Sequence, residues 1–168
     1  MRQTLFEVID RLVEDRELGF RFFAVFSRFE YALKRSNFIK KGQFDAAMPD
    51  WDRFATQLRG HFAGVKDEHF IIACKYLEEE PPKKQIVQQG RLAWHDNAPR
   101  DDDFEEKYLL RLVRTVRNNL FHGGKYPYPI GSLPEAIRNR VLLENSMVIL
   151  EQCLALSLEL RSHYEEAV

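Results

Sequence analysis

Apolar residues recur at helical spacing along most of the chain. In the run Gly19 to Lys41, three phenylalanines and a leucine repeat at intervals of four, three and four, which places them on one stripe of a helix. These residues are Phe22, Phe26, Phe29 and Leu33. Glu30 falls at the edge of the stripe, where a carboxylate beside the core needs a cation. The pattern predicts a core helix, preceded by a short amphipathic helix over about residues 3–16.

Two further helices are predicted in the first half of the chain. Asp50 is a natural N-cap for a helix that begins near Pro49, and another helix precedes the pair Pro81 and Pro82. From Lys83 to Asp103 the period is lost, which predicts a long surface connection with a short helix near residues 86–92. No segment clearly predicts a strand.

The penultimate helix combines an apolar stripe with acids in its first turn and cations later, the order that the helix dipole favours. The stripe residues are Leu109, Val113, Val116 and Leu120. Gly123 and Gly124 favour a left-handed C-cap, so we expect the helix to end near Phe121.

The last helix is predicted to run from the N-cap Ser132 to the C-terminus, roughly 48 Å at 1.5 Å per residue. It carries two apolar stripes, one through Leu143, Leu150 and Leu158 and another through Ile149 and Leu160. A helix that is apolar on two sides needs two partners. One is its own bundle, and the other is a second subunit or a further internal helix. We favour the homodimer.

These elements predict an all-α fold, an up-and-down helical bundle with a long C-terminal helix. The length of 168 residues and the 45% apolar content suit one core, so we expect a single domain over 1–168, with an N-terminal helical addition at 1–17 and the core bundle at 18–165.

The charge and the cysteine content of the chain exclude some classes of function. The formal charge of −1 excludes a globally basic nucleic-acid binder, so any phosphate contact must come from a local cluster. Cys74 and Cys153 lie apart in apolar surroundings, as buried thiols do, and fit a reducing cytoplasm. No segment resembles a signal peptide or a membrane span. We therefore expect a cytoplasmic protein with no membrane partner.

The candidate chemistry lies at the end of the penultimate helix. Arg117 and His122 are five residues apart, or about 140° on a continuous helix, but the glycines allow His122 to turn back toward Arg117. An imidazole, a guanidinium and the neighbouring amide of Asn118 suit a phosphodiester. The alternative is that these residues have no catalytic role. His122 then only places a cation at the helix end, Arg117 pairs with Glu30, and the asparagines are ordinary polar residues of the last turn.

The stretch "RNNLFH", placed at the end of the penultimate helix of a small α-bundle, resembles the signature of the HEPN superfamily (higher eukaryotes and prokaryotes nucleotide-binding). The resemblance implies metal-independent cleavage of RNA at a cleft between two protomers, with Arg117, Asn118 and His122 as the catalytic residues. It also implies a bacterial toxin or defence role, with an antitoxin or another regulatory protein as a possible partner. We count Glu30, Arg114 and Lys125 as supporting residues.

Other readings stay open at this stage. The rival function is a non-catalytic HEPN-like dimeric module that binds RNA, a nucleotide or a protein. His95, Asp96 and the run Asp101 to Asp103 could suggest a divalent cation, but acidic runs in loops are usually only solvated, so no metal and no cofactor are expected. Trp51 and Trp94 are interpreted as anchors of the core or of loops rather than as base-stacking residues.

Overall fold

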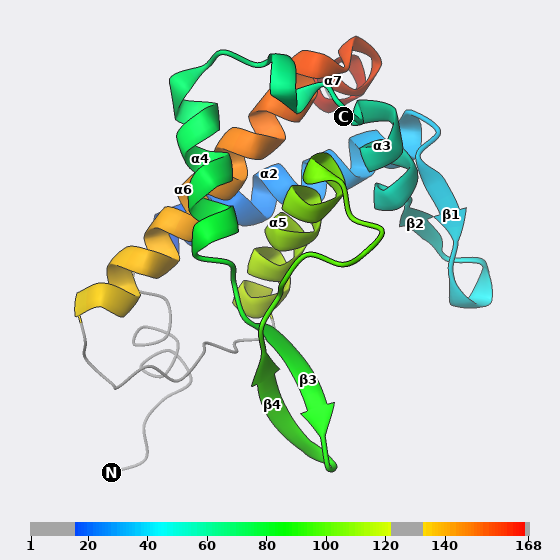
Figure 1. The fold of residues 1–168 in the computed structure, drawn as a ribbon. Helices are drawn as coiled ribbons and strands as arrows, with labels where there is room; N and C mark the ends of the chain where they lie inside the picture. Colours follow the sequence, from blue (N-terminus) through cyan, green and yellow to red (C-terminus); the bar gives the residue numbers. More distant parts are fainter. Residues whose placement is uncertain (1–15, 122–132, 167–168) are drawn as a thin grey trace.

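Helices form most of the protein. The computed structural model describes residues 16–121 and 133–166, in which two short antiparallel hairpins accompany the helices (Figure 1). The elements in chain order are α2 (Arg16–Arg35), β1 (Ile39–Lys41), η1 (Gln43–Asp45), β2 (Ala47–Pro49), α3 (Trp51–Leu58), η2 (Phe62–Gly64), α4 (Glu68–Glu79), β3 (Lys84–Gln88), β4 (Arg91–His95), α5 (Glu105–Phe121), α6 (Leu133–Leu156) and α7 (Leu158–Glu165). The fold is mostly α, and the expectation of a purely helical bundle is wrong in that respect. The short helix expected near residues 3–16 lies outside the described residues.

Helix α2 runs through the centre of the core. The four residues of its predicted stripe are 0–2% exposed. Full burial of a phenylalanine side chain contributes about 1.5–3 kcal/mol relative to an exposed one, so this stripe is a main source of stability. The helix packs against α5, α6 and α7. It ends at Arg35 rather than continuing toward Lys41, because Asn37 adopts a positive φ of 64° and the chain enters β1.

Helix α3 begins where the sequence predicts, and α4 ends at Glu79, before Pro81 and Pro82 as predicted. The carboxylate of Asp50 accepts a hydrogen bond from the backbone of Arg53, and Asp67 caps α4 in the same way. Trp51, the first residue of α3, is 3% exposed and its ring stacks on Phe29 at a centroid distance of 5.4 Å. Its interpretation as a core residue is confirmed.

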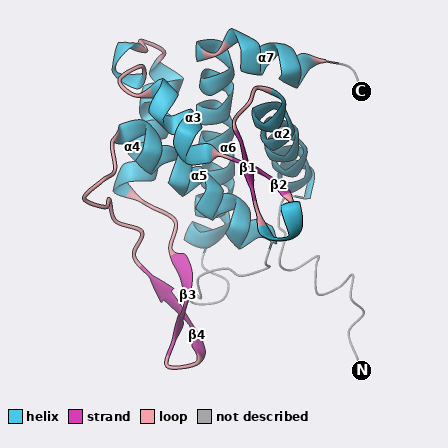
Figure 2. Cartoon of the chain, turned by 90° about the vertical axis from the view of Figure 1, so that its right-hand side faces the viewer, coloured by secondary structure: helices cyan, strands magenta, loops and turns pink. Residues whose placement is uncertain are grey.

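The predicted connection from Lys83 to Asp103 contains a β-hairpin in place of a short helix. Strands β3 and β4 pair in register, Lys84 opposite His95 and Gln88 opposite Arg91, and the hairpin extends beyond the ends of the helices (Figure 2). Gln89 and Gly90 form its two-residue turn with φ of 51° and 74°, as a type I′ turn requires. The hairpin leaves Val87 and Leu92 exposed, so the inside–outside alternation that marks a half-buried strand is absent.

The predicted long C-terminal helix is broken. Ser157 has an extended backbone (φ −133°, ψ 97°), and α6 and α7 meet at an angle of 113°. Leu158, expected on an apolar stripe, is 80% exposed, whereas Leu160 is buried. The apolar pattern continues across the break because α7 folds back over α2 and forms its own apolar contact there.

Both sides of α6 meet partners within the chain. Leu142 and Cys153 are buried on one side and Leu150 on the other, while α6 contacts α4, α2 and α5. An internal position, the alternative to a second subunit, therefore accounts for its two apolar stripes. A dimer has to be argued from another surface.

Candidate functional site

Arg117 lies just before the last described turn of α5, where its guanidinium is held by two aromatic rings. The guanidinium carbon is 5.4 Å from the ring centre of Phe26 and 4.7 Å from that of Phe121. Its side chain is 32% exposed, as expected for a position on the flank of the apolar stripe. Contact with rings from two helices fixes the plane of the guanidinium and leaves its edge for an anion.

Glu30 connects Arg117 to the core. Its Oε2 is 3.9 Å from Nη2 of Arg117, within ion-pair range but too long for a hydrogen bond. Its Oε1 accepts a hydrogen bond of 3.1 Å from the indole Nε1 of Trp51. The carboxylate thus lies opposite Arg117, as the sequence analysis expects, and its position is also set by α3.

Some donors on the two terminal nitrogens of Arg117 have no hydrogen-bond partner among the described residues. Nη1 donates to Oδ1 of Asn118 at 3.0 Å, and Nε is buried without a hydrogen-bond partner among the described residues. A guanidinium has five N–H donors and recognises phosphate through two of them at once. Arg117 therefore has the donors needed to bind a phosphate while it stays in contact with Glu30.

Two of the predicted site residues, His122 and Lys125, lie outside the described residues. Helix α5 is described as far as Phe121, and its predicted C-cap at Gly123 and Gly124 also lies outside the described residues. The geometry therefore brings Arg117, Asn118 and Glu30 together, and the role of His122 stays a prediction from the sequence.

Arg114 lies one turn before Arg117 and faces a different neighbour. Its guanidinium is 5.9 Å from the ring centre of Trp51. Burial lowers the pKa of Arg114, Asp52 and Glu30 act in the opposite direction, and the nearby cations Arg100 and Arg111 lower it further. An arginine stays charged even so, and the attraction to Asp52 and Glu30 is larger than the repulsion from Arg100 and Arg111.

The region around Arg114 is a polar recess of about 290 Å³. It is lined by Asp52, Lys84, Asn97, Arg100, Lys107, Arg111, Arg114, Thr115 and Asn118. Sequence reasoning missed most of these residues. One signal was present, because Arg111, Arg114 and Asn118 are spaced three and four apart and so share a face of α5. The residues from β3, α3 and the loop before α5 carried no such signal.

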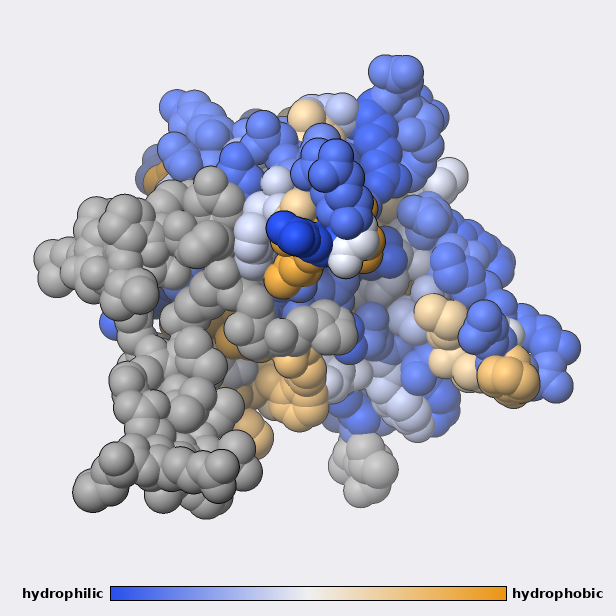
Figure 3. All heavy atoms as spheres, turned by 90° about the horizontal axis from the view of Figure 1, so that it is seen from below, coloured by the Kyte–Doolittle hydropathy of each residue, from blue (hydrophilic) through white to orange (hydrophobic). Residues whose placement is uncertain are grey.

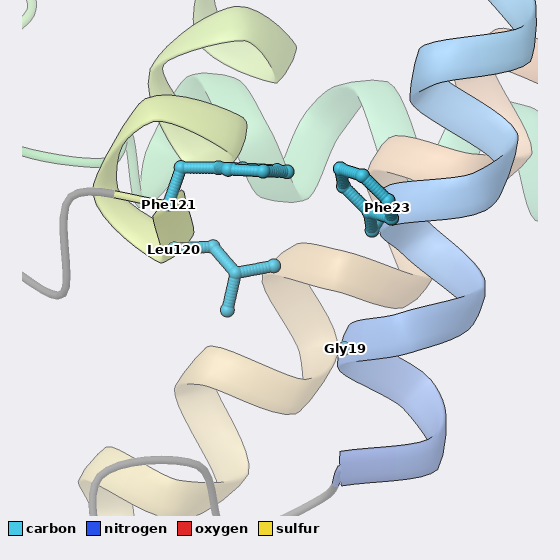
Figure 4. A pocket seen from close by; sticks show the side chains of 4 residues that line it. All are labelled: Gly19, Phe23, Leu120 and Phe121. Carbon is cyan, nitrogen blue, oxygen red and sulfur yellow. The ribbon is translucent and has the colours of Figure 1, made fainter. Parts of the chain in front are cut away.

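A second recess, of about 380 Å³ and mainly apolar, is lined in part by Phe121. Figure 4 shows the rings of Phe23 from α2 and Phe121 from α5 facing each other, with Leu120 below them and Gly19 on the wall. The ring centres of Phe23 and Phe121 are 4.9 Å apart. The phenylalanine that contacts Arg117 therefore also borders an apolar surface.

The acidic loop residues pair with cations of α5. Asp103 contacts Arg111, and Asp102 contacts Lys107. Within residues 16–121 and 133–166, no group of three histidine, cysteine or carboxylate side chains is placed to hold a metal ion. In the same ranges, no single helix is long and apolar enough to cross a membrane, although the bent pair α6 and α7 passes that test jointly.

Comparison with known proteins adds no relative. Neither the protein-family models, nor the curated proteins, nor the solved structures contain a match to this chain.

Proposed function

We propose that this protein is a metal-independent endoribonuclease of HEPN type, with a toxin or defence role in the cytoplasm. The observation that carries the proposal is the placement of Arg117. Its guanidinium is fixed between Phe26 and Phe121, is faced by Glu30, and keeps spare donors beside Asn118 at the end of the helix that leads to His122. Such a group can hold the phosphate of an RNA strand and stabilise charge on it during cleavage.

In this proposal His122 transfers protons. It acts as the base that activates a ribose 2′-hydroxyl, or as the acid that protonates the departing 5′-oxygen. The 2′-oxygen attacks the phosphorus, the bond to the 5′-oxygen breaks, and the product carries a 2′,3′-cyclic phosphate. DNA has no 2′-hydroxyl, so it can be bound but not cut by this route.

The proposal places the active site at a homodimer cleft. Its support is the apolar recess between Phe23 and Phe121, together with Phe20 on the same helix as Phe23, which is 70% exposed. Apolar side chains lie near the centre of the face seen in Figure 3, among mainly hydrophilic ones. A symmetric contact there would bring two copies of Arg117 together, which raises the positive charge available to a phosphate backbone. Light scattering at micromolar concentration tests this, and a monomeric mass contradicts the shared cleft.

The experiment that tests the activity is incubation of total RNA with wild type and His122→Ala in EDTA. Cleavage by wild type alone, with cyclic phosphate ends, supports the proposal. Loss of a proton-transfer group costs about 10²–10⁴ in rate, so the variant should be nearly silent. Cleavage that requires Mg²⁺ contradicts the role given to His122.

The alternative is a module that binds RNA, a nucleotide or a protein without cutting. The cation-lined recess beside Asn118 favours it, because such a recess holds phosphate without any need for a proton-transfer group. A preparation that binds diverse RNAs and leaves them intact supports this alternative.

A further inference from the structure

The polar recess beside α5 carries more positive charge than its own carboxylates balance. Among the described residues, five cationic side chains and one carboxylate, Asp52, line it. Two more carboxylates, Asp102 and Asp103, pair with Lys107 and Arg111. Five positive and three negative groups leave a surplus of two positive charges, on a chain whose formal net charge is −1. The surplus is therefore a local feature of the fold.

Three of the five cations form no ion pair with a carboxylate among the described residues. Within the described ranges, no carboxylate lies within ion-pair distance of Lys84, Arg100 or Arg114, and none of their side chains forms a hydrogen bond. Nε of Arg111, also on the lining, is buried without a hydrogen-bond partner. Cations that are brought together and left unpaired repel each other, so an anion between them would be stabilised.

The recess is held in shape by the loop that follows the hairpin. The amide of Asn97 donates to the hydroxyl of Thr115 at 2.9 Å, and its Oδ1 accepts from Arg111. The hydroxyl of Tyr108 donates to the backbone oxygen of Asn97 at 3.0 Å. Asn97 is 4% exposed, so these contacts pin the loop to α5 and set the position of Arg100.

The lining identifies the part of a nucleic acid that it suits. Among the described residues it contains carboxylate, amide, hydroxyl, ammonium and guanidinium groups but no aromatic ring, and Trp51 is buried beneath Arg114. Bases of single strands are usually bound by stacking on exposed rings, whereas clustered cations bind the phosphate backbone. The recess therefore suits phosphates better than stacked bases.

Asn118 joins the recess to Arg117. It lines the recess and accepts the hydrogen bond from Nη1 of Arg117. From Arg111 to Asn118 this face of α5 extends about 10 Å along the helix axis, at 1.5 Å per residue, and it ends at Asn118, the hydrogen-bond partner of Arg117. An extended strand that lies along this face would reach the Arg117 site directly.

We propose that this recess binds the phosphate backbone of the same RNA strand whose scissile phosphate lies at Arg117. The choice of RNA rests on the proposed function. The recess is a sequence-independent subsite that holds the nucleotides flanking the cleavage point, and Lys84 and Arg100 contact phosphates there.

The test measures binding of a single-stranded 2′-O-methyl oligonucleotide, which lacks the attacking hydroxyl, by fluorescence anisotropy at several salt concentrations. The double variant Lys84→Gln/Arg100→Gln removes two exposed cations of the recess. Lys66→Gln/Arg91→Gln is the control, because both residues are exposed, lie outside the lining and give the same net charge. A thermal melt of each variant checks that it is folded.

We expect the recess variant to bind the oligonucleotide about tenfold more weakly or worse, and equally so for all sequences. The slope of log binding constant against log salt concentration should be shallower by roughly 1.4, or about 0.7 for each lost phosphate contact. The control should bind like wild type. Asp52→Asn, which removes the lining carboxylate, should bind more tightly. Equal binding by the recess variant and wild type, or equal losses in recess variant and control, overturns the proposal.

Two other outcomes separate this proposal from the ribonuclease activity. If wild type cleaves RNA and the recess variant binds the oligonucleotide normally, the subsite is wrong and the activity stands. If binding depends on the recess but no RNA is cut, the proposed ribonuclease activity is wrong and the subsite is supported. Inorganic phosphate is the third arm: if the recess binds it while the variant leaves oligonucleotide binding unchanged, the recess serves a free anion and the RNA assignment is overturned.

Discussion

The carboxylate of Glu30 on α2 lies 3.9 Å from the guanidinium of Arg117 on α5, two residues that are 87 positions apart in the sequence. The other carboxylate oxygen is engaged by Trp51. One acidic side chain thus links α2, α3 and the candidate site, which makes it a sensitive point for both folding and activity.

Glu30→Gln should lower activity more than stability. Gln keeps an oxygen that can accept from Trp51 but loses the charge opposite Arg117, and a partly exposed ion pair contributes about 0.2–1 kcal/mol. Urea unfolding measures the stability change, and RNA cleavage measures activity. Glu17→Gln is the matched control, because Glu17 forms an exposed pair with Arg21 on the same helix. Equal effects of both changes on cleavage would remove Glu30 from the site.

Arg117→Lys should fold like wild type but cut RNA at least about 10²-fold more slowly. Lysine keeps the charge, yet it has no planar group to lie against Phe26 and Phe121 and no bidentate donors. Single-turnover rates measure the loss, and circular dichroism checks the fold. Arg21→Lys, an exposed site on α2, serves as control. Activity near that of wild type would show that only charge is needed at position 117.

Arg28→Gln should destabilise the protein without altering the chemistry. Nε of Arg28 donates to the backbone oxygen of Tyr164 at 2.8 Å, and its Nη2 contacts the oxygens of His163 and Glu166. These carbonyls at the end of α7 lack helical partners, and charge-assisted hydrogen bonds contribute about 1.5–3 kcal/mol when buried and less at this half-exposed site. We expect a loss of about 1–2 kcal/mol in urea unfolding. An unchanged unfolding midpoint would mean that α7 is held by its apolar contacts alone.

Because its thiols are buried, we expect the free energy of unfolding to fall at alkaline pH. Burial, aided by the carboxylates of Glu105, Glu78 and Glu106, raises the pKa of Cys74 from 9.0 to about 12, and burial also raises the pKa of Cys153. Because the folded pKa is raised, the contribution of Cys74 is fully present below pH 9 and is lost as pH rises from 9 toward 12. Urea unfolding between pH 8 and pH 11 should show a smaller decline for Cys74→Ala than for wild type, by at most about 1.4 kcal/mol per pH unit. Identical declines would contradict the raised pKa.

The sequence by itself determined the elements whose signals are local. The 3.6-residue period of Phe22, Phe26 and Phe29 marks the core face of α2, and the carboxylate of Asp50 marks the start of α3. The same period places Arg117 on the flank of the α5 stripe, so its partial burial was predictable. Each of these features depends on residues within one or two turns.

Only the tertiary structure decided how distant segments meet. The hairpin of β3 and β4 depends on a turn in which Gln89 adopts positive φ, and the break at Ser157 lies within an unbroken apolar pattern. The cationic recess joins Lys84, Arg100 and Arg114 from a strand, a loop and a helix. Periodicity reports which face of an element is buried but not what covers it, and charges converge only when long-range packing of apolar faces brings their segments together.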